Sequence, residues 1–248
     1  MPRYRLTLEY DGTGLAGWQR QATGVSVQAL IEAAFEKFCQ QQVAVVAAGR
    51  TDAGVHALAQ VAHVDLSRLR DPEEIRNAIN FHLRPARVAV LDVAQAPHEF
   101  HARFSATGRR YLYRIINRRA PLALDQDRAW AITRPLDAEA MHRGAQVLVG
   151  HHDFSSFRDA QCQAKSPMKT LDRLDVTRLG EEIAVRAEAR SFLHHQVRNM
   201  VGTLKLVGEG KWTEMDMAKA LAARNRSAAG QTAPAAGLYL SGVGYEPR

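Results

Sequence analysis

The stretch Arg3-Tyr4-Arg5-Leu6-Thr7-Leu8-Glu9-Tyr10 decides how this chain begins to fold, because apolar and polar residues alternate along it. A period of two is typical of a strand that buries one of its faces. The face expected in the core carries Tyr4, Leu6, Leu8 and Tyr10. We therefore predict a half-buried strand over residues 3–10.

The segments that follow extend this strand into the order β-α-β-β-α-β. Ser26 is a suitable N-cap, and apolar residues recur after it at helical spacing, which predicts a helix to about Gln41. Asp71-Pro72-Glu73-Glu74 begins a second helix with a cap, a proline at the first position and an acidic first turn. The remaining strands are expected at residues 43–48, 59–66 and 88–93. This order is the split β-α-β unit.

The second half of the chain repeats the order more loosely. Its expected strands cover residues 110–116, 171–178, 182–189 and 238–243, and its expected helices cover 137–149, 195–207 and a short segment after Thr213. The two halves have no detectable sequence similarity, so the repeat is inferred from element order. We expect an α+β fold of two ferredoxin-like halves, residues 1–104 and 105–248. Joined into one extended, mainly antiparallel sheet with helices on one face, they would leave a central cleft for a ligand.

Composition limits the class of protein. The 248 residues are 46% hydrophobic, which is enough to bury a substantial core. Thirty-three basic against 26 acidic residues leave a formal charge of +7, which favours a polyanionic partner. Cys39 and Cys162 show no pairing pattern, and neither a signal-peptide core nor a membrane span of ~18 apolar residues is present. We expect reduced thiols in a soluble, cytoplasmic protein that does not enter a membrane.

The stretch Gly49-Arg50-Thr51-Asp52-Ala53-Gly54-Val55-His56 places a guanidinium and a carboxylate two residues apart in a loop between two expected strands. This loop would lie at the rim of the cleft, where chemistry is expected. An ordinary turn explains the same residues, because Asp bonds its own backbone and Gly supplies a positive φ. Taken alone, the octet leaves both interpretations open.

Two other segments carry arginines that suit a nucleic-acid partner. Residues 103–114 combine four arginines with three aromatic residues, and arginine binds phosphate while aromatic rings stack on bases. A solvated strand face explains these arginines equally well. Farther along, Arg198 lies beside the apolar stripe of the helix after His194-His195, where it either snorkels or pairs with a carboxylate.

The sequence supports neither a metal site nor a cofactor. His151-His152-Asp153 and His194-His195 contain zinc-ligand residue types, but adjacent positions rarely converge on one ion and no His-x-x-x-His or Cys-x-x-Cys spacing occurs. Gly12, Gly14 and Gly17 are not followed by the Gly-Lys-Ser/Thr of a nucleotide loop. A Gly-x-Ser-x-Gly elbow for acyl transfer is also missing.

Seven segments, in order, resemble the tRNA pseudouridine synthase A family. Besides the octet Gly49–His56 they are Tyr10-Asp11-Gly12-Thr13, Gly17-Trp18-Gln19, Arg110-Tyr111-Leu112-Tyr113, His152-Asp153-Phe154-Ser155-Ser156-Phe157, Val197-Arg198-Asn199-Met200-Val201-Gly202, and Thr232-Ala233-Pro234 with Gly237-Leu238-Tyr239-Leu240. The resemblance spans almost the whole chain.

The resemblance implies that the chain isomerises uridine to pseudouridine without a cofactor. It assigns the catalytic carboxylate to Asp52 and the cation that keeps it ionised to Arg198. Tyr111 matches the tyrosine that stacks on the target base and assists removal of the proton from carbon 5. Arg50 is expected to fill the space left by the extruded base. Tyr113, on the same strand face as Tyr111, is expected to pack in the core.

The same resemblance implies a homodimer that binds tRNA and modifies uridines at positions 38 to 40 of the anticodon arm. Arg109, Arg110 and Arg114 are the expected phosphate contacts. A non-catalytic RNA-binding module is the alternative, although it would gain nothing from a carboxylate facing phosphates. A metal-dependent nuclease would need clustered acids, and Asp52 has no carboxylate near it in the sequence.

Overall fold

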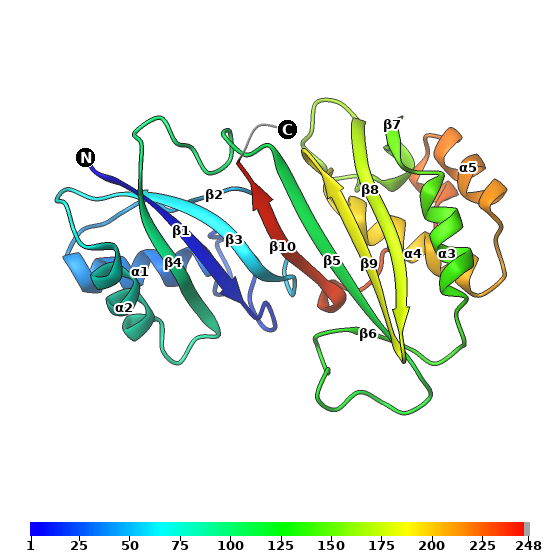
Figure 1. The fold of residues 1–248 in the computed structure, drawn as a ribbon, viewed down its shortest axis with the longest axis horizontal. Coiled ribbons are helices and arrows are strands. Elements are labelled where there is room, and N and C mark those ends of the chain that lie inside the picture. The colour runs from blue at the N-terminus through cyan, green and yellow to red at the C-terminus, as the bar shows by residue number, and fades with distance from the viewer. Residues whose placement is uncertain (246–248) are drawn as a thin grey trace. The chain divides into compact units, whose positions relative to one another are not determined.

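The computed structural model describes residues 1–245 and divides the chain into two compact units. Unit 1 contains Met1–Thr107 and the strand residues from Tyr239 onward, and unit 2 contains Gly108–Leu238. Each unit combines strands with helices (Figure 1). Within the two units, two of the described strand pairs are parallel, β10 with β3 and β6 with β5. The other pairs are antiparallel. The predicted α+β class with mainly antiparallel pairing is confirmed.

Unit 1 has the strand order β4-β1-β3-β10, with β2 beside β3. Its elements are β1 Arg3–Tyr10, α1 Val27–Cys39, β2 Val46–Ala47, β3 His56–Asp65, α2 Pro72–Leu83, β4 Val88–Ala96 and β10 Leu238–Gly244. Burial alternates along β1, and the predicted core residues Tyr4, Leu6, Leu8 and Tyr10 are at most 4% exposed. The other face of β1 stays partly exposed, because α1 and α2 pack together on one face of this sheet.

Unit 2 has the order β5-β9-β8-β7, with β6 beside β5. Its strands are β5 Gly108–Asn117, β6 Trp130–Ile132, β7 Gly150–Asp153, β8 Met168–Leu179 and β9 Glu182–Ala189. Its helices are α3 Ala138–Gln146, α4 Gln196–Gly208 and α5 Glu214–Ala222. Helix α3 packs on β8 and contacts both α4 and α5.

The predicted helix starts are confirmed by their caps. Ser26 accepts from the Ala29 N–H, Asp71 accepts from the Glu73 N–H, and Thr213 forms a capping box with Asp216. Such caps are local, so the sequence shows them directly. Among residues 1–245, the structure contains no helix long and apolar enough to span a membrane.

Several predicted boundaries differ from the structure. Strand β3 begins at His56 instead of residue 59, because His56 already pairs with Tyr239 of β10. Strands β6 and β7 were not predicted, since three or four residues are too few to show a period. The predicted halves 1–104 and 105–248 differ from the units at the C-terminal end, because β10 pairs with β3. Residues 246–248 of the second predicted half lie outside the described part of the chain.

Candidate active site

The loop that carries Arg50 and Asp52 in unit 1 is anchored by buried side chains of the neighbouring strands. The Tyr10 hydroxyl lies 2.8 Å from Thr51 Oγ1, and Gln60 Nε2 donates to the Gly49 carbonyl at 2.8 Å. Burial raises the pKa of Tyr10 to about 12, so its hydroxyl is neutral at physiological pH. Both ends of the Gly49–Thr51 segment are therefore held from the core.

A second loop, residues 11–18, supports the Asp52 loop by backbone contact. The Trp18 N–H donates to the Thr51 carbonyl at 3.0 Å, and the Gly54 N–H donates to the Leu15 carbonyl at 3.4 Å. Gly17 has a φ of +95°, and a Cβ built there would lie 2.6 Å from the Thr51 oxygen. The close approach of the two loops therefore requires a glycine at residue 17.

Gly17→Ala is expected to lower the free energy of unfolding by more than the ~1–3 kcal/mol of an unfavourable backbone conformation, because the added methyl also meets the Thr51 carbonyl. Gly14→Ala is the matched control, since Gly14 has a φ of +76° and nothing within 4 Å of the added Cβ. Urea denaturation of both variants measures the loss in free energy of unfolding. The difference between the two losses is the cost of the contact with the Thr51 carbonyl, apart from the cost of the backbone conformation. Equal losses in the two variants would contradict the close-packing argument.

Within the loop, the backbone makes a turn, and Asp52 and Arg50 differ in their surroundings. The Val55 N–H donates to the Asp52 carbonyl at 3.1 Å, and Gly54 has a φ of +76°. The turn interpretation is therefore correct for the backbone of this loop. Asp52 is half-buried, whereas Arg50 is exposed and has no hydrogen bond or ion pair within residues 1–245.

In unit 2, the two tyrosines of β5 have different environments. Tyr113 is fully buried, and its hydroxyl donates to the Pro234 carbonyl at 2.8 Å. Burial raises the pKa of Tyr113, and the nearby charge of Arg198 opposes this shift. Tyr111 is only half-buried and meets Phe192 edge to face at 5.1 Å between ring centroids. The prediction that Tyr113 packs in the core is confirmed.

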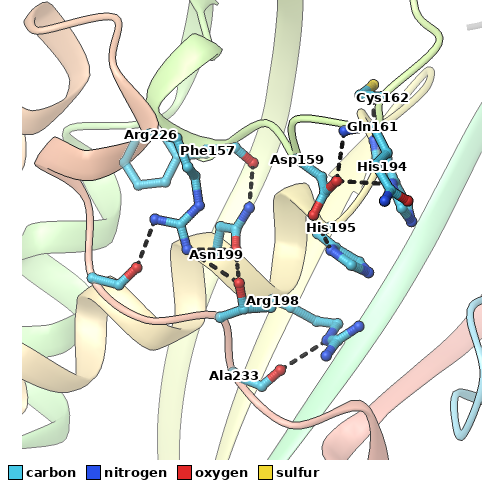
Figure 2. A network of polar contacts seen from close by, with 12 residues as sticks. Phe157, Asp159, Gln161, Cys162, His194, His195, Arg198, Asn199, Arg226 and Ala233 are labelled. Atoms are coloured by element: carbon cyan, nitrogen blue, oxygen red, sulfur yellow. Dashed lines mark hydrogen bonds and ion pairs between the residues drawn. The ribbon is translucent and has the colours of Figure 1, made fainter.

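Arg198, the third residue of α4, forms two hydrogen bonds with Ala233, and each residue donates one of them. Its Nε donates to the Ala233 carbonyl at 2.8 Å, and the Ala233 N–H donates to the Arg198 carbonyl at 3.1 Å. Figure 2 shows the side chain extending from the helix to this carbonyl. The direction of the guanidinium therefore depends on where the chain places Ala233.

The three β5 arginines predicted to bind phosphate have different partners. Arg114 binds Glu182 through two nitrogens at 2.9 and 3.1 Å and also binds Asp125 at 3.0 Å. Arg109 donates to the Arg190 carbonyl at 2.8 Å. Arg110 is exposed, and its side chain has no hydrogen bond or ion pair within the described chain. Of the three, Arg110 fits a phosphate contact best.

The paired histidines of unit 2 bond to protein oxygens. His151 Nδ1 lies 3.0 Å from Thr170 Oγ1, and His152 Nε2 lies 3.0 Å from the Val149 carbonyl. His195 Nδ1 lies 2.7 Å from Asp159, a residue that no sequence motif indicated (Figure 2). Partial burial raises the pKa of Asp159, but hydrogen bonds from the Gln161 N–H and His195 outweigh it and the net shift is downward.

The structure places Arg50 and Asp52 together in unit 1, and Tyr111, Arg198 and the three β5 arginines in unit 2. A family model described as tRNA pseudouridine synthase matches residues 7–105 and 145–246. The chain belongs to the tRNA pseudouridine synthase family. This assignment confirms the resemblance and makes the chain an enzyme of an isomerase family.

Full-length relatives agree with the tRNA pseudouridine synthase assignment. Proteins named tRNA pseudouridine synthase A are similar to this chain at 66% identity in Paramagnetospirillum magneticum and at 63% in Rhodospirillum centenum. These alignments cover 99% of this chain and 96% and 100% of the relatives. A third, from Xanthobacter autotrophicus, is 60% identical over 99% of the chain. The matched family segments contain Arg50, Asp52 and Arg198, whereas Tyr111 lies between them.

Proposed function

We propose that this pseudouridine synthase isomerises uridine in tRNA with Asp52 as the catalytic carboxylate. The observation that carries the proposal is the loop geometry of unit 1. Asp52 is half-buried on a turn that two buried side chains and a second loop hold in place, and exposed Arg50 lies two residues away. A rigid backbone that presents a carboxylate suits a catalytic group, which must be held in a productive geometry.

The reaction breaks the bond from ribose C1′ to base N1 and makes a bond from C1′ to C5 of the same ring. The proton on C5 leaves and N1 gains one, so no atom is exchanged with another molecule and no electron is transferred. A carboxylate starts this reaction either by adding to the sugar or by initiating elimination from it. Both routes need an ionised Asp52, whose ordinary pKa is about 3.9.

In the same proposal, Arg198 keeps Asp52 ionised during catalysis, since an opposite charge offsets the effect of burial on a carboxyl pKa. Tyr111 stacks on the base and assists removal of the C5 proton. Its partly exposed ring leaves surface for stacking. Arg50 occupies the space of the extruded base, and its exposure without a partner among residues 1–245 suits that role.

The proposed substrate is the anticodon arm of tRNA, with uridines 38 to 40 as the targets and a cytoplasmic homodimer as the acting form. The net charge of +7 supports a polyanionic substrate. Mapping pseudouridine in unmodified tRNA transcripts, incubated with the pure protein as the only other macromolecule, tests the positions. Pseudouridine confined to sites outside the anticodon arm would overturn the substrate assignment. Light scattering at working concentration tests the dimer.

A non-catalytic RNA-binding module was the other function open at the level of sequence. Membership of an enzyme family favours catalysis, and the supported half-buried position of Asp52 has no use in a surface that only binds phosphates. The same mapping experiment separates the two functions, because a binding module would retain tRNA and form no pseudouridine.

Arg110→Ala is expected to flatten the salt dependence of tRNA binding by about 0.7–0.9 in the slope of log K against log salt, the value for one lost phosphate contact. Arg114→Ala is the matched control from the same strand face, since its guanidinium is already bound to Glu182 and Asp125. Filter binding over a series of salt concentrations measures both slopes. An unchanged slope for Arg110→Ala would show that Arg110 does not contact phosphate and is only part of a solvated strand face.

A further inference from the structure

Arg226 of unit 2 is a half-buried arginine that has no acidic partner in the described part of the chain. It lies in the short 3-10 turn Arg226–Ala228 that follows α5, and no carboxylate of residues 1–245 forms an ion pair with it. Its guanidinium donates instead to the neutral oxygens of Gly230 at 2.8 Å, Asn199 at 3.1 Å and Thr232 at 3.1 Å. Neutral acceptors offset only part of the hydration that a buried charge loses.

Arg114 shows the usual arrangement in this chain, with the guanidinium paired to two acids. Because Arg226 has no such partner in the described chain, we infer that the arrangement of its hydrogen-bond donors is more important for its role than pairing of its charge. Arginine offers a planar fork of donors, which lysine lacks. Arg226 uses this fork to join three points of two segments.

Asn199 is the buried centre of this network, at 0% exposure. Its Nδ2 donates to the Phe157 carbonyl at 2.9 Å, and its Oδ1 accepts from Thr232 Oγ1 at 2.6 Å and from Arg226. The two donors on Oδ1 determine the orientation of the amide. Asn199 therefore connects α4, through Arg226 and Thr232, to residues 226–232.

The network surrounds the link that holds Arg198. Asn199 is the next residue of α4 after Arg198, and Thr232 directly precedes Ala233, whose carbonyl accepts from Arg198 Nε (Figure 2). Helix and segment also touch through their backbones, because a Cβ at Gly202 would lie only 1.8 Å from the Gln231 oxygen. A displacement of Thr232 would therefore move the carbonyl that orients Arg198.

We infer that Arg226 is a positioning residue for catalysis, acting through Asn199, Thr232 and the Ala233 carbonyl on the direction of the Arg198 guanidinium. This inference rests on the proposed role of Arg198. Arg226 has no role in contacting the substrate under this proposal. Its loss changes the rate of the chemical step and leaves tRNA affinity nearly unaltered.

Arg226→Gln is expected to lower the single-turnover rate of pseudouridine formation at saturating tRNA by about 10–100-fold, since small misplacements of catalytic groups have effects of this size. The dissociation constant for tRNA is expected to stay within about twofold. Arg224→Gln is the matched control, because Arg224 is two residues away, its side chain is 71% exposed, and its ion pair is with Asp153 at 3.6 Å. Its rate is expected to match the wild type.

The decisive measurement is a double-mutant cycle with Arg198→Lys. Because Arg226 acts through Arg198, Arg226→Gln is expected to slow the Arg198→Lys enzyme little or not at all. Additive losses would show that Arg226 acts on the fold in general and would overturn the inference, as would a wild-type rate for Arg226→Gln alone. A wild-type rate for Arg198→Lys would overturn both the proposed role of Arg198 and the inference that rests on it.

A second variant covers the case in which Arg226→Gln does not fold, which thermal melting detects. Thr232→Ala removes the 2.6 Å bond to Asn199 and keeps the arginine. Like Arg226→Gln, it is expected to lower the single-turnover rate, and this loss is expected to disappear in the Arg198→Lys background. A Thr232→Ala enzyme that is folded and fully active would overturn the inference.

Discussion

Asp52→Asn is expected to lower the single-turnover rate of pseudouridine formation by at least about 10⁴-fold, the scale seen when an essential catalytic group is lost. Asparagine keeps the size of the side chain but cannot carry the negative charge that both routes require. The loop itself is expected to survive, because its anchors involve Thr51, Gly49 and the backbone of Asp52. Affinity for tRNA is expected to remain or to increase slightly.

Asp92→Asn is the matched control for this loss of charge. Asp92 lies in the same unit on β4, its side chain is 58% exposed, and its ion pair with Arg5 spans 4.0 Å. We expect this variant to turn over at the wild-type rate. Rapid-quench assays of both variants at saturating tRNA make the comparison, and near-normal turnover by Asp52→Asn would disprove its catalytic role.

Tyr111→Phe is expected to bind tRNA normally and to form pseudouridine about 10²–10⁴-fold more slowly, the range for loss of an acid–base group. Phenylalanine retains the ring that is proposed to stack on the base and that meets Phe192, and it removes only the hydroxyl. The expected loss therefore lies in the chemical step. Single-turnover measurement at saturating tRNA separates this step from binding.

Tyr113→Phe is the control, because Tyr113 lies two residues along the same strand and is buried. This change removes the 2.8 Å bond to the Pro234 carbonyl, so the free energy of unfolding is expected to fall by about 1 kcal/mol. Its turnover is expected to stay near that of the wild type. Equal activity of the two variants would limit Tyr111 to a stacking role. Loss of activity in Tyr113→Phe alone would show that Tyr113, and not Tyr111, takes part in the reaction.

Local features of the sequence predicted most elements correctly. Strand β1 and the starts of α1, α2 and α5 follow from alternation and caps, which act over a few residues. The short strands β6 and β7 and the parallel pairing of β10 with β3 escaped prediction. Pairing between distant segments leaves no local pattern, so element order alone assigned β10 to the second half.

The sequence by itself determined the family, the order of the main elements and the residues to examine, because contiguous motifs and hydrophobic periods are local properties of the chain. Only the tertiary structure showed that Arg110 and Arg114 differ, since Glu182, which binds Arg114 through two nitrogens, is 68 positions away in the chain. Arg198 likewise meets Ala233 across 35 positions, and Asn199 meets Arg226 across 27. Partners this far apart are brought together by the packing of whole elements, which no local pattern records.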